Sequence, residues 1–235
     1  MPQIRVHPLP GLIPSECDLS DSCCVVIDVL RATTSMVMAL EAGARSIRPF
    51  ESIDEAREFA AANSYLLAGE RQGLKIEGFD LGNSPLEFTS EKVGGRKIAM
   101  TTTNGTKALM ACKSARQVIV AAFVNLSAVC ELVSSRESQV DIVCAGTDGE
   151  VTIEDNLLAG AIVERCVSLE NGNDHVRQSV DLWKSHQLEL ESALMNSKGG
   201  KNLLKISRGE DIRFASQIDL SRLLPKMADG EIRAF

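Results

Sequence analysis

Short apolar runs alternate with helical segments along most of this chain, and this alternation limits the fold more than any single motif. The runs are four to seven residues long, and a segment with helical periodicity lies between most of them. Strands connected through helices pair in parallel, and the helices cover both faces of the sheet. We therefore expect an α/β fold with a mainly parallel sheet. The predicted strands are CCVVIDV, YLLA, KIAMT, QVIVAA and VDIVCA.

Several helix ends can be predicted from local signals. The first helix should follow Arg31 and end at Gly43, because glycine is a common C-terminal cap. Ser52 and Glu55 have capping-box spacing, so a second helix should begin there. A long helix is expected from about 175 to 196, followed by the stretch SKGGK and a shorter helix. We treat residues 1–235 as one domain, with a subdivision near 170–174 left open.

Charge and composition exclude several classes of protein. The formal net charge of −7 gives no general attraction to phosphate backbones, so we expect no nucleic acid partner. The N-terminal sequence MPQIRVHPLPGLIP lacks the apolar region of a signal peptide, and the longest apolar runs are short. We expect a cytoplasmic protein without a membrane partner. An anionic ligand would then need a few placed cations, helix ends or a metal.

The cysteines and histidines do not suggest a site. The seven cysteines include no CxxC pair, and several lie in apolar runs, so we expect reduced thiols in the core. His7 lies in a Pro-rich segment, and His175 and His186 lie on an expected amphipathic helix. We expect all three histidines at the surface, without a catalytic triad.

Three segments share one order of strand, small polar loop and helix. They are VVIDVLRATTSMVMAL, KIAMTTTNGTKALMAC and DIVCAGTDGEVTIEDNLLAG. In a parallel sheet such loops all leave from the carboxyl ends of strands, which is the edge where these folds bind ligands. We expect the three polar loops to lie together at that edge.

The loop TTTNGT has the features of a phosphate cradle. A helix that begins near Thr106 leaves its first N–H groups unpaired, with the positive end of its dipole toward the loop. Gly105 lets the backbone approach a ligand, and Thr102, Thr103 and Asn104 supply polar side chains. The alternative is that these residues only cap the helix and form the turn.

Carboxylates and an arginine stand at the other two loops. Asp28 ends a buried strand and Arg31 follows it, so Asp28 needs a metal or an ion partner, while Arg31 suits a phosphate or carboxylate. The alternative is a salt bridge between the two. The third loop offers oxygen ligands that suit Mg²⁺, from Asp148, Glu150, Glu154 and Asp155, although Asp155 also has capping-box spacing from Thr152.

A long polar loop follows the second predicted strand. The segment 66–88 is rich in glycine, and a loop of this length in a compact domain is usually functional or disordered. Its apolar residues favour an ordered loop. Its candidate ligand-binding residues are Glu70, Arg71, Lys75, Asn83 and Ser84.

Five segments, in order over most of the chain, together resemble the 2-phosphosulfolactate phosphatase family. The resemblance implies a Mg²⁺-dependent enzyme that hydrolyses 2-phospho-3-sulfolactate to 3-sulfolactate and inorganic phosphate, a step toward coenzyme M. It also implies a three-layer α/β/α fold with its site at the strand ends. The segments are VIDVLRATTS (26–35), LLAGERQGLKIEGFDLGNSPLEF (66–88), MTTTNGTKAL (100–109), CAGTDGEVTIEDNLLAG (144–160) and GGKNLLKISRGEDIRFASQID (199–219).

These considerations give each candidate residue an expected role. Asp28 and Glu70 would hold Mg²⁺, and Glu154 or Asp155 would orient or deprotonate an attacking water. The partner would be a small anionic phosphorylated substrate, and homo-oligomer formation is left open. Two alternatives remain: a phosphatase for another small phosphorylated hydroxy acid, and a non-catalytic anion-binding protein. The expected substrate-binding residues are Arg31, Arg71, Asn83, Ser84, Thr102, Thr103, Asn104, Gly105 and Thr106.

Overall fold

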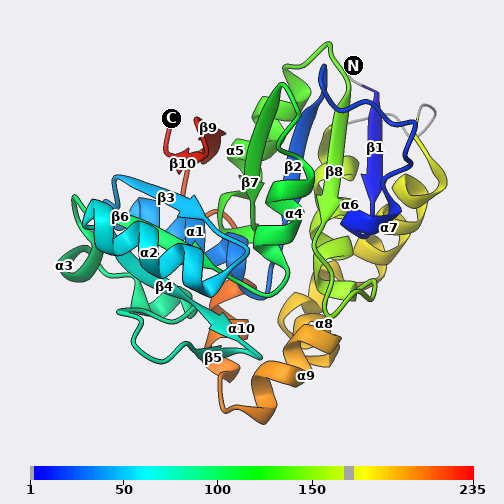
Figure 1. The fold of residues 1–235 in the computed structure, drawn as a ribbon. Helices are drawn as coiled ribbons and strands as arrows, with labels where there is room; N and C mark the ends of the chain where they lie inside the picture. The colour runs from blue at the N-terminus through cyan, green and yellow to red at the C-terminus, as the bar shows by residue number, and fades with distance from the viewer. Residues whose placement is uncertain (1–2, 167–171) are drawn as a thin grey trace.

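A single mixed sheet organises the described part of the chain, residues 3–166 and 172–235 of this computed structural model (Figure 1). Among these residues the strand order is β1-β8-β2-β7-β9-β10-β3-β6-β4-β5. The expected α/β fold with a mainly parallel sheet is confirmed. The strands are β1 (Ile4–His7), β2 (Cys23–Ile27), β3 (Ser46–Pro49), β4 (Leu66–Arg71), β5 (Leu74–Lys75), β6 (Lys97–Thr101), β7 (Gln117–Ala121), β8 (Val140–Cys144), β9 (Lys226–Ala228) and β10 (Glu231–Arg233).

The sheet consists of two parallel groups joined by a hairpin. Strands β1, β8, β2 and β7 pair in parallel and form the first parallel group. Strands β3, β6 and β4 form the second parallel group, with β5 antiparallel to β4. The hairpin β9–β10 lies between the groups and pairs antiparallel with β7 on one side and β3 on the other. The sheet is therefore continuous only through this hairpin.

Helices cover both faces of the sheet. Alternate residues of β2 show why: Val25 packs with α5, α6 and α7 on one face, and Val26 packs with α1 and α4 on the other. Burial on both faces explains the uninterrupted apolar run of this strand. The helices are α1 (Ala32–Glu41), α2 (Ile53–Asn63), α3 (Ser90–Val93), α4 (Gly105–Ala111), α5 (Leu126–Ser134), α6 (Ile153–Cys166), α7 (Asp174–His186), α8 (Leu190–Asn196), α9 (Lys198–Lys205) and α10 (Gly209–Ala215), with 3-10 turns at Pro10–Leu12, Pro85–Glu87, Phe123–Asn125 and Gln187–Glu189.

The five predicted strands are confirmed as β2, β4, β6, β7 and β8. The predicted start of the second helix is also confirmed, because the Ser52 side chain accepts a hydrogen bond from the Glu55 N–H at 3.3 Å. Strands β2 and β8 pair in parallel and end together, at Ile27 and Cys144. Strand β6 belongs to the second parallel group, which runs opposite to the first because each of the three pairings through the hairpin is antiparallel. The prediction of one common edge therefore holds within the sheet only for the loops after β2 and β8.

The prediction of one long helix over 175–196 is wrong. A 3-10 turn at Gln187–Glu189 separates α7 from α8 and leaves Leu188 almost fully exposed. The turn changes the direction of the chain, so that Leu190 and Leu194 pack into the core. Helix α9 then begins inside the stretch SKGGK, where Ser197 caps it by accepting from the Gly200 N–H. The proposed boundary at 170–174 lies partly outside the described residues.

The surface position expected for His7 is also wrong. His7 lies on β1, is 2% exposed, and its Nε2 lies 2.7 Å from Oδ1 of Asp141. Its burial is tolerated because the ring has this partner, which no local sequence signal indicates. The expectation for the cysteines is confirmed, since all seven are free and six are buried.

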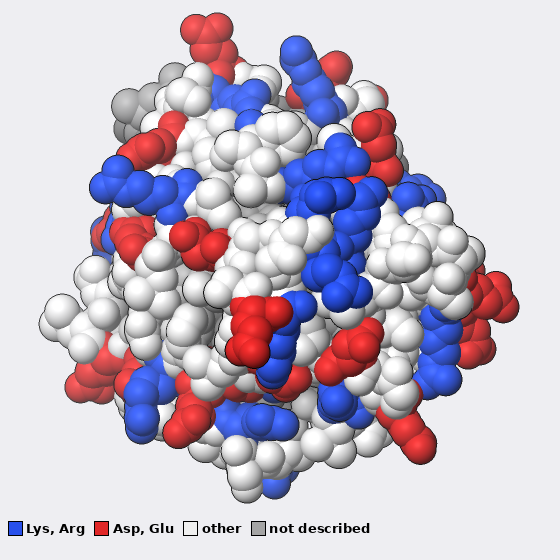
Figure 2. All heavy atoms as spheres, turned by 90° about the vertical axis from the view of Figure 1, so that its left-hand side faces the viewer, with Lys and Arg blue, Asp and Glu red and all other residues white. Residues whose placement is uncertain are grey.

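Charge is unevenly distributed over the surface. Figure 2 shows lysine and arginine side chains gathered in one region of the face that it draws, although the chain has a formal net charge of −7. Net charge therefore says little about the local field, which depends on where single cations lie. None of the helices described here has the length and apolar character needed to span a bilayer.

Candidate active site

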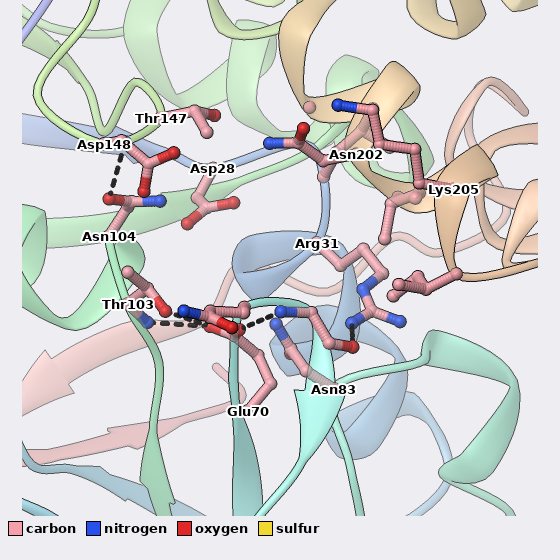
Figure 3. A pocket seen from close by; sticks show the side chains of 16 residues that line it. Asp28, Arg31, Glu70, Asn83, Thr103, Asn104, Thr147, Asp148, Asn202 and Lys205 are labelled. Carbon is pink, nitrogen blue, oxygen red and sulfur yellow. Dashed lines mark hydrogen bonds between the residues drawn. The ribbon is translucent and has the colours of Figure 1, made fainter.

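A cavity of about 360 Å³ lies at the carboxyl ends of β2, β4, β6 and β8, between the two parallel groups and α9 (Figure 3). Six of the predicted site residues line it, and they come from both parallel groups. The cavity is therefore the place where the polar loops meet, as expected. The predicted residues that line it are Asp28, Arg31, Glu70, Asn83, Thr103 and Asn104.

Asp28 follows β2 and points into the cavity (Figure 3). Its Oδ1 accepts a hydrogen bond from the Ala32 N–H at 3.2 Å, and Oδ2 has no hydrogen-bond donor among the described residues. Burial raises the pKa of Asp28 to about 7, and the charges of Glu70 and Glu154 add to the rise. Asp28 thus keeps one oxygen available to a cation or a proton in the cavity.

Glu70 is held in place by three hydrogen bonds. Its Oε1 accepts from the N–H of Thr103 at 2.8 Å and from the Thr103 hydroxyl at 2.9 Å. Its Oε2 accepts from the Gly73 N–H at 2.7 Å. Three donors stabilise the ionised carboxylate and fix its orientation beside the cavity. Glu70 therefore connects the loop after β6 to the turn between β4 and β5.

The residues of the loop TTTNGT divide between the turn before α4 and the lining of the cavity. Thr102 and Thr106 bond to each other: the Thr106 N–H donates to the Thr102 hydroxyl at 3.0 Å, and the Thr106 hydroxyl donates to the Thr102 carbonyl. These two residues therefore form the turn. Thr103 and Asn104 line the cavity instead. A Cβ on Gly105 would lie 2.8 Å from Oδ2 of Asp28, so glycine is needed for this close approach.

Arg31 lines the cavity with its charge already paired. Its Nη1 lies 2.6 Å from Oδ2 of Asp211 on α10, and its Nη2 donates to the Gly73 carbonyl at 2.7 Å. The partner is thus Asp211 and not Asp28, which was the alternative considered from the sequence. Ser84 donates to the other oxygen of Asp211. Arg31, Ser84 and Asp211 form a buried junction under the cavity.

Arg71 and Asn83 differ in their access to the cavity. Arg71 is not among the lining residues, and its guanidinium donates to the Thr101 hydroxyl at 2.9 Å and to main-chain carbonyls. Asn83 does line it, and its buried Oδ1 has no hydrogen-bond partner in the described structure. Lys75 is exposed on β5 and lies outside the lining.

Glu154 and Asp155 begin α6 behind the cavity wall, and neither lines the cavity. Both oxygens of Asp155 accept main-chain hydrogen bonds at 2.9 Å, one from Val29 and one from Gly146. Asp155 thereby ties the ends of β2 and β8 together. Glu154 uses only Oε1, which accepts from the Gly199 N–H at 3.1 Å, and its buried Oε2 has no partner in the described structure.

The environment raises the pKa values of the two acidic residues in the first turn of α6, Glu154 and Asp155. Burial raises the pKa of Glu154, and burial together with the charges of Asp28 and Glu154 raises the pKa of Asp155 well above its usual value. Carboxyl groups with raised pKa values beside a cavity are typical of catalytic sites.

Several lining residues were not predicted from the sequence. Helix α9 forms one wall of the cavity with Asn202 and Lys205, and the loop after β8 contributes Thr147. Asp148 of the same loop also lines the cavity, and it is one of the four acidic residues named from the sequence. The strand-loop-helix pattern indicated the loop after β8, but not which of its residues face the cavity. Nothing in the pattern of α9 distinguishes its lining residues from solvated ones.

A second group of potential metal ligands lies elsewhere. One ligand atom from each of His7, Cys17 and Asp141 lies within 4.8 Å of the others, and none of the three lines the cavity. Arg5 donates to both oxygens of Asp141, at 2.7 and 2.9 Å, so the carboxylate is already neutralised. This group is a buried ion-pair cluster at β1 and β8.

The chain matches one family of known proteins over most of its length. The model of the 2-phosphosulpholactate phosphatase family matches residues 8–230. Proteins named "Probable 2-phosphosulfolactate phosphatase" are 40% identical in Caldanaerobacter subterraneus subsp. tengcongensis over 221 residues, and 41% identical in Thermotoga maritima over 217 residues. Each alignment covers 92% of both chains. A relative with the same name from Synechocystis is 38% identical over 95% of both chains. The chain belongs to the 2-phosphosulpholactate phosphatase family, named for the hydrolysis of a phosphoric monoester.

Proposed function

We propose that this protein hydrolyses 2-phospho-3-sulfolactate to 3-sulfolactate and inorganic phosphate with the help of Mg²⁺. The proposal rests on one observation: Asp28, Glu70 and the Thr103–Asn104 loop all line the same cavity. Carboxylates next to polar groups suited to phosphate are expected where a cation and a phosphate bind together. Family membership supplies the name of the substrate.

The residues present fit a magnesium ion. Mg²⁺ is usually held by one or two carboxylates, with water and substrate phosphate completing its shell. Asp28 offers an oxygen without a donor, and Glu70 is held in position by its three hydrogen bonds. When bound there, the ion would neutralise phosphate charge and favour the attack of water on phosphorus.

The remaining groups of the cavity suit the phosphoryl group and the attacking water. Thr103, Asn104 and Asn83 supply neutral polar groups around it. Neither Glu154 nor Asp155 lines the cavity, but Glu154 is the better candidate for accepting the water proton. It keeps an unpartnered oxygen, whereas Asp155 uses both of its own, and the hydroxyl of the lining residue Thr147 lies 3.5 Å from Glu154 Oε1. Asp155 holds the strand ends that place Asp28. One water is consumed, and its hydrogens end on the phosphate and on the hydroxyl of 3-sulfolactate.

One set of assays distinguishes this function from the two alternatives, a phosphatase for another small phosphorylated hydroxy acid and a non-catalytic anion-binding protein. Phosphate release is measured from 2-phospho-3-sulfolactate, 2-phospholactate and phosphoglycerate, each with Mg²⁺ and with a chelator. We expect Mg²⁺-dependent release that is fastest from the sulfonated ester. Faster release from phosphoglycerate would favour a phosphatase for another small hydroxy acid. Binding of the esters without release from any of them would favour the anion-binding protein.

A further inference from the structure

The cavity has two walls of opposite chemistry. One wall carries the carboxylates of Asp28, Glu70 and Asp148, together with the Thr103–Asn104 loop. The opposite wall is α9, which contributes Asn202 and Lys205 (Figure 3). A substrate that places its phosphate against the first wall therefore presents the rest of its structure to α9.

Lys205 is the cation of the cavity whose charge is not already paired. The lining contains two cations, Arg31 and Lys205. Arg31 is neutralised by Asp211 at 2.6 Å, whereas no ion pair or hydrogen bond joins Lys205 to any residue in the described parts of the chain. An ammonium group without a partner at a cavity mouth is free to attract a bound anion, although its exposure lets salt screen that attraction.

Helix α9 is fixed at its N-terminal end. Lys198 lies 3.0 Å from Glu150 and donates to the Thr147 carbonyl at 3.3 Å, which ties α9 to the loop after β8. The Gly199 N–H donates to Glu154 at 3.1 Å. Asn202 and Lys205 are three residues apart, so they share a face of a helix that is already held in place. The helix thus fixes where the two residues stand, while both side chains are exposed at the cavity.

We propose that Lys205 and Asn202 form the subsite for the sulfonate of the substrate, and that Lys205 determines selectivity for a sulfonated ester. The proposal rests on the proposed function. A sulfonate is tetrahedral and presents three oxygens, which suits a compact ammonium group and an amide N–H. A carboxylate matches the planar guanidinium of arginine better. Lys205 therefore suits the sulfonate. The sulfonate is bonded to the carbon next to the one that bears the phosphate, whereas the carboxylate is bonded directly to the phosphate-bearing carbon, so the sulfonate reaches further from the phosphate.

The test compares two esters that differ only in the sulfonate, 2-phospho-3-sulfolactate and 2-phospholactate. In Lys205→Met we expect the ratio of their kcat/KM values to fall by about 10- to 100-fold, the usual range for losing a charged hydrogen bond. The loss should appear mainly in KM, because the sulfonate is bound equally in the ground and transition states. Lys205→Arg should restore part of the ratio.

A matched control comes from the same helix. Lys201 is exposed on α9 and does not line the cavity, so Lys201→Met should leave the ratio unchanged. Thermal unfolding of each variant checks that the fold is intact. An equal loss on both esters in Lys205→Met, or no change in the ratio, would overturn the proposal.

Binding of the dephosphorylated acids separates this proposal from the proposed function. Calorimetry compares 3-sulfolactate with lactate in the wild type and in Lys205→Met, and it does not depend on turnover. We expect tighter binding of 3-sulfolactate in the wild type and no such preference in the variant. Equal affinities in the wild type would refute the subsite, whatever the hydrolysis assay shows. Absence of hydrolysis with the preference intact would refute only the phosphatase activity.

Discussion

Arg31 and Asp211 form a buried ion pair, with Nη1 of the first lying 2.6 Å from Oδ2 of the second, although 180 positions separate them in the chain. The pair joins the loop after β2 to α10, and Ser84 adds a third segment by donating to Asp211. The base of the cavity is thus closed by residues from three distant parts of the sequence.

Replacing Asp211 should destabilise the protein strongly. Asp211→Ala leaves the Arg31 guanidinium buried without a counterion, which usually costs about 3–5 kcal/mol. Urea unfolding measures the loss. The exposed pair of Arg213 and Glu191 is the control, and Glu191→Ala should cost at most about 1 kcal/mol. Equal losses of unfolding free energy in the two variants would show that the buried ion pair stabilises the protein no more than the exposed one.

Removing the Asp28 carboxylate should abolish the response to magnesium. Mg²⁺ at about 100 times its Kd should stabilise the wild type by about 2.7 kcal/mol, a shift that thermal unfolding detects without any turnover. We expect no such shift in Asp28→Asn, and phosphate release should fall by at least about 100-fold. Asp181→Asn, which changes an exposed carboxylate on α7, should keep both properties. An unchanged magnesium shift in Asp28→Asn would remove Asp28 from the metal site.

Variants of Glu154 and Asp155 should differ in their effects: one should mainly lower turnover and the other mainly lower stability. Asp155→Asn turns an NH₂ group toward the N–H of Val29 or Gly146, so it should lose about 1–3 kcal/mol of stability. Glu154→Gln keeps an oxygen for the Gly199 N–H and should unfold nearly like the wild type, but with slower phosphate release. Denaturant unfolding and steady-state rates are measured on both variants. The opposite pattern would assign the proton-accepting role to Asp155.

The Asp141 cluster should make stability depend on pH in the acid range. Burial alone would raise the pKa of Asp141, but the hydrogen bonds from His7 and Arg5 outweigh it and lower the pKa to about 2. Because the folded pKa is below the unfolded value of about 3.8, the stabilisation is complete above pH 4 and disappears as the pH falls to about 2.

Asp141→Asn tests this dependence. The difference of nearly two pKa units corresponds to about 2 kcal/mol, which the variant should lose at pH 7. Unfolding curves of the two proteins should converge as the pH approaches 2. Asp181→Asn should match the wild type across the same range, since its carboxylate is exposed. A gap that persists at pH 2 would point to lost packing instead of lost charge.

Elements with a strong local signal could be predicted from the sequence. Strand β2 is apolar on both faces, and β8 is interrupted only by Asp141. Each is followed by a polar loop and a helix, which was enough to place the candidate site at the ends of these strands. Hairpin strands β9 and β10 have three residues each, too few for any periodicity. Their place in the sheet depends on partners distant in the chain, so the sequence does not show it.

The candidate site residues could likewise be predicted only where a local sequence signal marks them. Asp28, Glu70 and Thr103 follow or end strands, where the fold itself indicates a ligand. Lys205 lies on a helix whose pattern resembles any solvated face, and only the packing of α9 brings it to the cavity. Asp211 could not be paired with Arg31 from spacing, because their contact is made by the tertiary fold.

The hairpin β9–β10 also has a consequence for when the protein becomes active. It follows every other described strand along the chain, so a ribosome has made both parallel groups before the strands that join them exist. Asp28 comes from one group and Glu70 from the other, which means that neither nascent half holds both carboxylates. The complete site should therefore form only late in synthesis, after the hairpin β9–β10 has been made and joins the two parallel groups.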